Sequence, residues 1–131
     1  MYTDGMGSDA FDPNDPLHVY LRELGTTQPL TRDEETVMLQ HVRNHDEQGE
    51  SSARRVIETK LSLVVSIAER HSSSSKIEML DLIEKGNGGL LTALDSFTGG
   101  SSESFATHAA YCIEQAILKF VAEARSRNET S

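Results

Sequence analysis

Several residue types that mark whole classes of protein are scarce in this sequence. Cys112 is the only cysteine, which excludes a disulfide framework and a cysteine zinc cluster and fits a reducing compartment. No apolar run is long enough to span a membrane, and the N-terminus lacks a signal-peptide pattern. The sequence therefore predicts a soluble, cytoplasmic protein with no membrane partner.

Positive charge is also scarce. Twelve Lys and Arg residues stand against 21 Asp and Glu, so the formal net charge is −9, which opposes non-specific binding to a polyanion. The length of 131 residues fits one domain, large enough to bury about two-thirds of the surface that its unfolded chain exposes.

No stretch alternates apolar and polar residues for long enough to form a strand, and no repeat period is present. Apolar residues instead recur at helical spacing, which predicts an all-α fold with five helices and short connections. We expect a flexible acidic tail over residues 1–14, one helical domain over residues 15–128, and a frayed C-terminus over residues 129–131.

Local signals predict where these helices begin and end. Asp15 followed by Pro16 is a helix start, and Gly25 is placed to end that helix. Residues 31–34 match a capping box, which opens the second helix, and Ser51 or Ser52 opens the third. We expect the four serines at 72–75, and the Gly and Ser-rich residues 98–104, to form loops.

The stretch from Ile77 to Phe97 contains three glycines, each of which disfavours a helix interior by about 1 kcal/mol relative to alanine. The helical spacing of apolar residues nevertheless continues through the glycines, so we predict one helix. Its middle has small side chains, which allow a neighbouring helix to approach closely. Its expected core stripe is Met79, Ile83, Gly86, Leu90, Ala93 and Phe97.

A second stripe on this helix mixes leucines with polar residues. It contains Leu80, Glu84, Asn87 and Leu91. Polar groups beside exposed leucines suit a partner helix that docks and leaves, because the polar groups stay hydrated in the unbound state. The alternative is that both leucines simply lie at the margin of the core.

The sequence shows no pattern typical of an enzyme, a cofactor site or a small-molecule substrate site. Residues 86–89 lack the Lys-Ser/Thr ending of a phosphate-binding loop and do not follow a strand. His41 and His45 have the spacing of metal ligands on a helix, but no glutamate base lies between them, so no metal is predicted. Cys112 is expected to be a small buried hydrophobic residue rather than a nucleophile.

Taken in order, four segments resemble the conserved block of bacterial sigma-70 family initiation factors. Residues 15–35 resemble its opening, and residues 61–68 resemble its Leu-Arg-Leu-Val-Val-Ser-Ile-Ala segment. Residues 81–90 are similar to Asp-Leu-Ile-Gln-Glu-Gly-Asn-Ile-Gly-Leu, and residues 105–117 to Phe-Ser-Thr-Tyr-Ala-x-Trp-Trp-Ile-Arg-Gln-Ala-Ile. The resemblance is collinear from Asp15 to Arg125 and implies a fold like sigma-70 region 2, preceded by region 1.2.

In that family the glycine-bearing helix docks on a coiled coil in the largest subunit of the RNA polymerase core. The resemblance therefore implies a core-binding role for Leu80, Asp81, Glu84, Asn87 and Leu91. Three departures alter this segment: Glu84 replaces Gln, Lys85 replaces Glu, and Gly88 replaces Ile.

The family's last helix, with the loop before it, captures unwound promoter DNA near the start site. The resemblance places this weakened DNA-binding role on Phe105, Thr107, His108, Tyr111, Gln115 and Lys119. The tryptophan pair of the family is Tyr111 and Cys112 here, its tyrosine is His108, and an arginine is Glu114. From Phe97 to the end there are three basic residues and four acids, Glu103, Glu114, Glu123 and Glu129, a balance that repels phosphate.

Three functions are compatible with these observations. The first is a sigma-like initiation domain that binds the polymerase core and, where DNA binding is retained, the promoter. The second is a regulatory decoy or adaptor that keeps the protein partner and has lost DNA capture. The third is a divergent helical domain with neither partner, in which His108, Tyr111 and Gln115 are ordinary surface residues.

Overall fold

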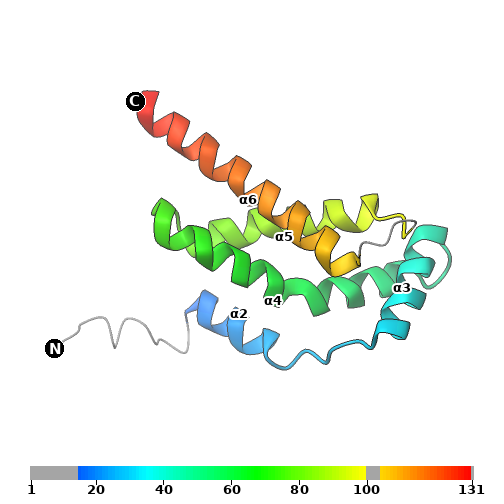
Figure 1. Ribbon diagram of the computed structural model, residues 1–131. Coiled ribbons are helices and arrows are strands. Elements are labelled where there is room, and N and C mark those ends of the chain that lie inside the picture. The colour runs from blue at the N-terminus through cyan, green and yellow to red at the C-terminus, as the bar shows by residue number, and fades with distance from the viewer. Residues whose placement is uncertain (1–14, 100–103, 131) are drawn as a thin grey trace.

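A computed structural model of the chain describes residues 15–99 and 104–130 (Figure 1). Within these ranges the fold is all-α, as predicted, with five helices and no strand. The helices are α2 (Pro16–Leu24), α3 (Arg32–Asn44), α4 (Gly49–Ser75), α5 (Met79–Ser96) and α6 (Phe105–Thr130). The expected tail over residues 1–14 and the terminal Ser131 lie outside the described residues.

The first two helices begin where the capping signals predict. The Asp15 carboxylate accepts a 2.8 Å hydrogen bond from the Leu17 amide, and Pro16 occupies the first turn. At α3, the Thr31 hydroxyl accepts from the Glu34 amide, and the Glu34 carboxylate accepts from the Thr31 amide. Both ends of this capping box are therefore satisfied.

The prediction of a loop at Ser72–Ser75 is wrong, because α4 continues through all four serines and ends at Ser75, where Lys76 caps it with a φ of 62°. The Ser73 and Ser74 hydroxyls donate to carbonyl oxygens three residues earlier, so these side chains are satisfied without leaving the helix. α4 also begins at Gly49, two residues before Ser51.

The core lies where α4, α5 and α6 pack against one another, and α2 lies along α4 (Figure 1). Its largest fully buried side chains are Leu82, Leu90, Ile113, Ile117, Val56 and Val64. α3 joins this layer through an ion pair of 2.7 Å between Lys60 of α4 and Glu35, both of them mostly buried. α6 runs on to Thr130, and its C-terminal part extends past the other helices.

The glycine-containing stretch is one continuous helix, as predicted, although it begins at Met79 rather than Ile77. A Cβ atom on Gly86 would lie 2.7 Å from Val64 of α4, and one on Gly89 would lie 2.6 Å from the Cys112 carbonyl oxygen of α6. The two glycines therefore allow α5 to approach both neighbours closely. Gly88 has no such role, because its Cβ would meet nothing within 4 Å.

The core stripe of α5 is wider than the sequence predicts. Ile83, Gly86, Leu90 and Ala93 are buried, as expected. Met79 and Phe97 are only partly buried, while Leu82, Gly89 and Leu94 are buried as well. α5 lies between two helices, and a helix packed on two sides buries more than one stripe. Among the described residues, no helix is long and apolar enough to cross a membrane.

Candidate functional site

Two surfaces contain the residues singled out by the sequence. The α5 face consists of Leu80, Asp81, Glu84, Asn87 and Leu91, and the α6 face of Thr107, Tyr111, Gln115 and Lys119. The other two predicted DNA-binding residues, Phe105 and His108, point inward, as described below.

The α5 face is a solvent-exposed line of residues three and four positions apart. Leu80 is 44% exposed and Leu91 is 52% exposed, so both leucines lie on the surface rather than at the margin of the core. Asp81 and Glu84 are exposed between them. Large apolar side chains on a helix face that no other helix covers are a feature of docking surfaces.

Asn87 lies in the middle of this face and is half-buried. Its side-chain oxygen is buried and has no hydrogen-bond partner among the residues that the structure describes. A buried acceptor without a partner is unfavourable by about 1–3 kcal/mol. Asn87 therefore differs from the other polar residues of this face, because its carbonyl oxygen is turned away from solvent while the residue as a whole stays half-buried.

The α6 face follows a single line along a solvent-exposed side of its helix, next to α5. Tyr111 is 63% exposed, and Gln115 and Lys119 follow it at intervals of four residues. Thr107 begins the line and is exposed, with its amide and hydroxyl both bonded to the Ser104 hydroxyl, which caps the helix. An aromatic ring, an amide and a cation in line are the groups that contact bases and phosphates.

The structure separates Phe105 and His108 from this line. Phe105 is 3% exposed and packs edge-on against Phe97, with ring centroids 5.3 Å apart, so it is a core residue. The His108 Nε2 atom lies 2.8 Å from the Ser96 hydroxyl and 3.8 Å from the Cys112 sulfur. Both side chains thus hold the start of α6 against the end of α5.

The position of Glu114 reduces the negative charge expected on the α6 face. Its carboxylate bonds to the Arg70 guanidinium at 3.0 Å and to the His71 Nε2 atom at 2.8 Å, and both partners belong to α4. Glu114 therefore faces α4 and is partly neutralised there. The count of charged residues after Phe97 includes it among the acids that repel DNA. Glu103 and the side chain of Glu129 lie outside the described residues.

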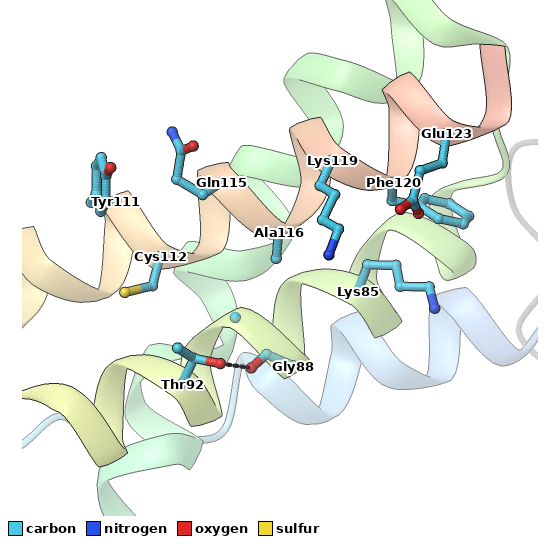
Figure 2. Close-up of a pocket in the computed structure, with 11 residues that line it drawn as sticks. Lys85, Gly88, Thr92, Tyr111, Cys112, Gln115, Ala116, Lys119, Phe120 and Glu123 are labelled. Carbon is cyan, nitrogen blue, oxygen red and sulfur yellow. Dashed lines mark hydrogen bonds between the residues drawn. The ribbon is translucent and has the colours of Figure 1, made fainter. Parts of the chain in front are cut away.

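Sequence reasoning misses the pocket between α5 and α6, which is shown in Figure 2. Tyr111, Gln115 and Lys119 line it from α6, and Lys85 and Gly88 line it from α5. The only sequence signals for it are the departures at Lys85, Gly88 and Cys112 from the pattern that the sequence resembles, because each replaces a larger or oppositely charged residue of that pattern.

His41 and His45 do not share one helix face. His45 lies just past the end of α3 with a φ of 52°, and the His41 Nδ1 atom lies 2.8 Å from the Asp46 carboxylate. This hydrogen bond to His41 lowers the pKa of Asp46 below its ordinary value of 3.8. The histidine pair is thus part of the turn between α3 and α4.

Comparison with known proteins gives two family matches, which together run through most of the chain. The family described as "Sigma-70 region 2" matches residues 56–127, and the one described as "Sigma-70 factor, region 1.2" matches residues 15–38. The first contains α5 and nearly all of α6, and therefore both surfaces described above.

Individual relatives agree with these matches. The chain is 38% identical over 110 residues to "RNA polymerase sigma factor SigA" of Bacillus sp, and 39% identical over 111 residues to the protein of that name in Listeria monocytogenes. Each alignment covers 84% of this chain and 28% of the relative. The chain thus spans less than a third of the length of these relatives.

Proposed function

The chain belongs to the sigma-70 family, and on that premise we propose that it serves transcription initiation without catalysing a reaction. It binds the RNA polymerase core through the α5 face, with the coiled coil of the largest subunit as the partner. It binds promoter DNA near the start site through the α6 face. The observation that carries the proposal is the exposure of both faces within the segment that matches sigma-70 region 2.

The composition of the α5 face supports a partner that binds reversibly. Covering the exposed halves of Leu80 and Leu91 contributes about 1 kcal/mol for each side chain. The exposed part of Asn87 offers one polar contact, worth about 0.5–1.5 kcal/mol. Asp81 and Glu84 remain hydrated before binding and favour a basic partner.

A binding assay with purified core polymerase tests this half of the proposal. Asn87→Ala and Leu91→Ala are each expected to weaken binding about 5-fold, since each removes about 1 kcal/mol of contact. Val37→Ala is the matched control, because Val37 is 50% exposed and lies on α3. Equal binding by all three variants, or no binding by the unmodified chain, would contradict the core-binding role.

The α6 face supports binding to single-stranded DNA. Tyr111 offers an exposed ring for base stacking, worth about 1–3 kcal/mol, and Lys119 forms no ion pair with any described residue. Because Glu114 faces α4, the acid that replaces a family arginine does not lie in this line. The α6 face therefore repels phosphate less strongly than the net charge of −9 of the whole chain indicates.

Binding of a fluorescent single-stranded promoter oligonucleotide at several salt concentrations tests the second half. Lys119→Ala is expected to reduce the slope of log K against log salt by about 0.7, the value for one lost phosphate contact. Arg22→Ala is the control, since it removes the same charge from an exposed site on α2. An identical slope for both variants would rule out a phosphate contact at Lys119.

The decoy or adaptor is the second candidate function. It is favoured by the burial of Phe105 and by the contact of His108 with Ser96 of α5, which leave fewer groups for bases than the sequence predicts. Binding to core polymerase without any binding to the oligonucleotide would support this alternative, and measurable binding to the oligonucleotide would argue against it.

A further inference from the structure

A groove between α3 and the start of α4 lies apart from both faces described above. It has a volume of about 550 Å³ and is lined by acids, apolar residues and serines, among them Asp33, Glu34, Val37, Met38, Ser51 and Ser52. These two helix segments meet at the end of the molecule opposite to the C-terminal part of α6 (Figure 1). This α3–α4 groove therefore shares no residue with the α5 face or the α6 face.

The apolar part of the α3–α4 groove is open to solvent. Val37 is 50% exposed, although it is a large apolar side chain in the middle of a helix. Met38 beside it packs against the core and is partly buried. A methionine side chain is flexible and adapts to whatever lies next to it. Together the two residues offer a surface that suits an apolar side chain of a partner.

Ser52 supplies a polar group inside the α3–α4 groove. It is 6% exposed and is the only buried polar or charged residue among those that the structure describes. The neighbouring Ser51 hydroxyl donates to the Gln48 carbonyl oxygen, whereas no described residue bonds to the Ser52 hydroxyl. The Ser52 oxygen is not fully enclosed, unlike the unpaired side-chain oxygens of Tyr20 and Asn87. It is therefore available to a backbone amide or carbonyl of a bound segment.

The charge of the α3–α4 groove is negative. Asp33 and Glu34 line it, and Asp33 forms no ion pair with a described residue. The arginines of α3, Arg32 and Arg43, line a different cavity on another side of the helix. Residues 31–52 contain six Asp and Glu against two Arg, so this segment carries −4 of the net charge of −9. The groove therefore repels a nucleic acid and attracts a basic partner.

We propose that the α3–α4 groove binds a basic segment of a partner protein. A large apolar side chain of that segment lies on Val37 and Met38, and a neighbouring lysine or arginine pairs with Asp33. Residues 1–14 of this chain are not the segment, because they contain three aspartates and no lysine or arginine. A second copy of the chain is disfavoured, because two molecules of charge −9 repel each other.

The probes are two lysine-rich helical peptides, one with leucines and one with phenylalanines along one face. Fluorescence anisotropy measures the binding of each labelled peptide to the full chain. We expect binding that weakens by about 10-fold when the apolar residues of the peptide are replaced by serine, and that is lost when its lysines are replaced by glutamate. In NMR spectra of the labelled chain, the bound peptide should shift the amide signals of Val37, Met38 and Ser52.

Val37→Glu separates binding in the groove from general attraction between an acidic chain and a basic peptide. The added negative charge strengthens general attraction, whereas loss of the apolar contact is expected to weaken binding in the groove by about 10-fold. Leu21→Glu is the matched control, because Leu21 is a 37% exposed leucine on α2, outside the groove. This control should bind the peptide at least as tightly as the unmodified chain does.

Asp33→Asn tests the charge contact. It is expected to weaken binding by about 3-fold at low salt and by less at high salt, which is the behaviour of an exposed ion pair. Asp81→Asn is the control, because Asp81 is likewise an exposed acid in the first turn of a helix. Equal binding by these two variants at low salt would rule out the pairing with Asp33.

The proposal is overturned if neither peptide binds, or if Val37→Glu binds as tightly as the unmodified chain. Sedimentation velocity tests the other occupant, since a dimer of the unmodified chain that the peptide dissociates would assign the groove to a second copy. Circular dichroism establishes that each variant is folded. No polymerase and no DNA are present in these assays, so their failure leaves the proposed roles of the α5 and α6 faces unchanged.

Discussion

Gly88 and Gly89 are neighbours in α5 with opposite surroundings, so the same substitution at each is expected to have opposite effects. In either position alanine improves helix propensity by about 1 kcal/mol. At Gly88 nothing lies within 4 Å of the new Cβ, so Gly88→Ala should raise the free energy of unfolding by about 0.5–1 kcal/mol.

At Gly89 the new Cβ would lie 2.6 Å from the Cys112 carbonyl oxygen, 2.9 Å from the Ile113 Cα and 3.0 Å from the Ala116 Cβ. Two of these atoms are backbone, so relief requires α5 and α6 to separate along their seam. Overpacking of this kind is unfavourable by about 1–3 kcal/mol, and a clash with backbone belongs at the upper end.

Because both variants share the gain in helix propensity, the difference between them isolates the clash. We expect Gly89→Ala to unfold with a free energy about 2–3 kcal/mol lower than Gly88→Ala. Urea denaturation followed by far-UV circular dichroism measures both values. Equal stabilities would refute the close approach at Gly89.

Three further predictions concern the core, a cap and a turn. Phe105→Ala should lower the free energy of unfolding by about 3–5 kcal/mol, because the ring is buried. Tyr111→Ala removes an exposed ring and should change this free energy by less than about 0.5 kcal/mol, a difference that urea denaturation measures. Thr31→Ala removes the capping box of α3 and should lower stability by about 1 kcal/mol in the same assay, and no loss would contradict the cap. The hydrogen bond to His41 lowers the pKa of Asp46 in the folded protein. This pair therefore stabilises the fold above pH 3.8, and the stabilisation is lost as the pH falls through the lower pKa of the folded state. In His41→Gln, NMR titration should show a higher pKa for Asp46.

The residues of the α5 face were predictable because a helix fixes the direction of each side chain from its position alone. Leu80, Glu84 and Leu91 are exposed on one line, as the sequence indicates. The unsatisfied oxygen of Asn87 was not predictable, since burial of a single atom depends on how neighbouring side chains pack. Whether this face binds a partner stays a prediction.

The predicted DNA-binding residues of α6 differ in their contacts, and helical spacing alone does not show which of them contact α5. His108 and Tyr111 are only three positions apart, yet His108 bonds to Ser96 of α5 while Tyr111 is exposed. Which of them contacts α5 depends on where α5 crosses α6, and the two helices approach closely at Gly89. Glu114 faces α4 because α6 also packs against that helix, and the space at Gly88 lies beside the α5–α6 contact.

The sequence by itself determined the helical class, the start of α2 and α3, and the continuity of α5 through its glycines, because caps and apolar periodicity act between residues a few positions apart. Tertiary structure decided the pairing of Glu114 with Arg70 and His71, which lie on another helix and more than forty positions away. The pocket also depends on tertiary structure, because its shape is set by the separation of α5 and α6. A residue's position in the sequence does not show which residue of the other helix lies opposite it.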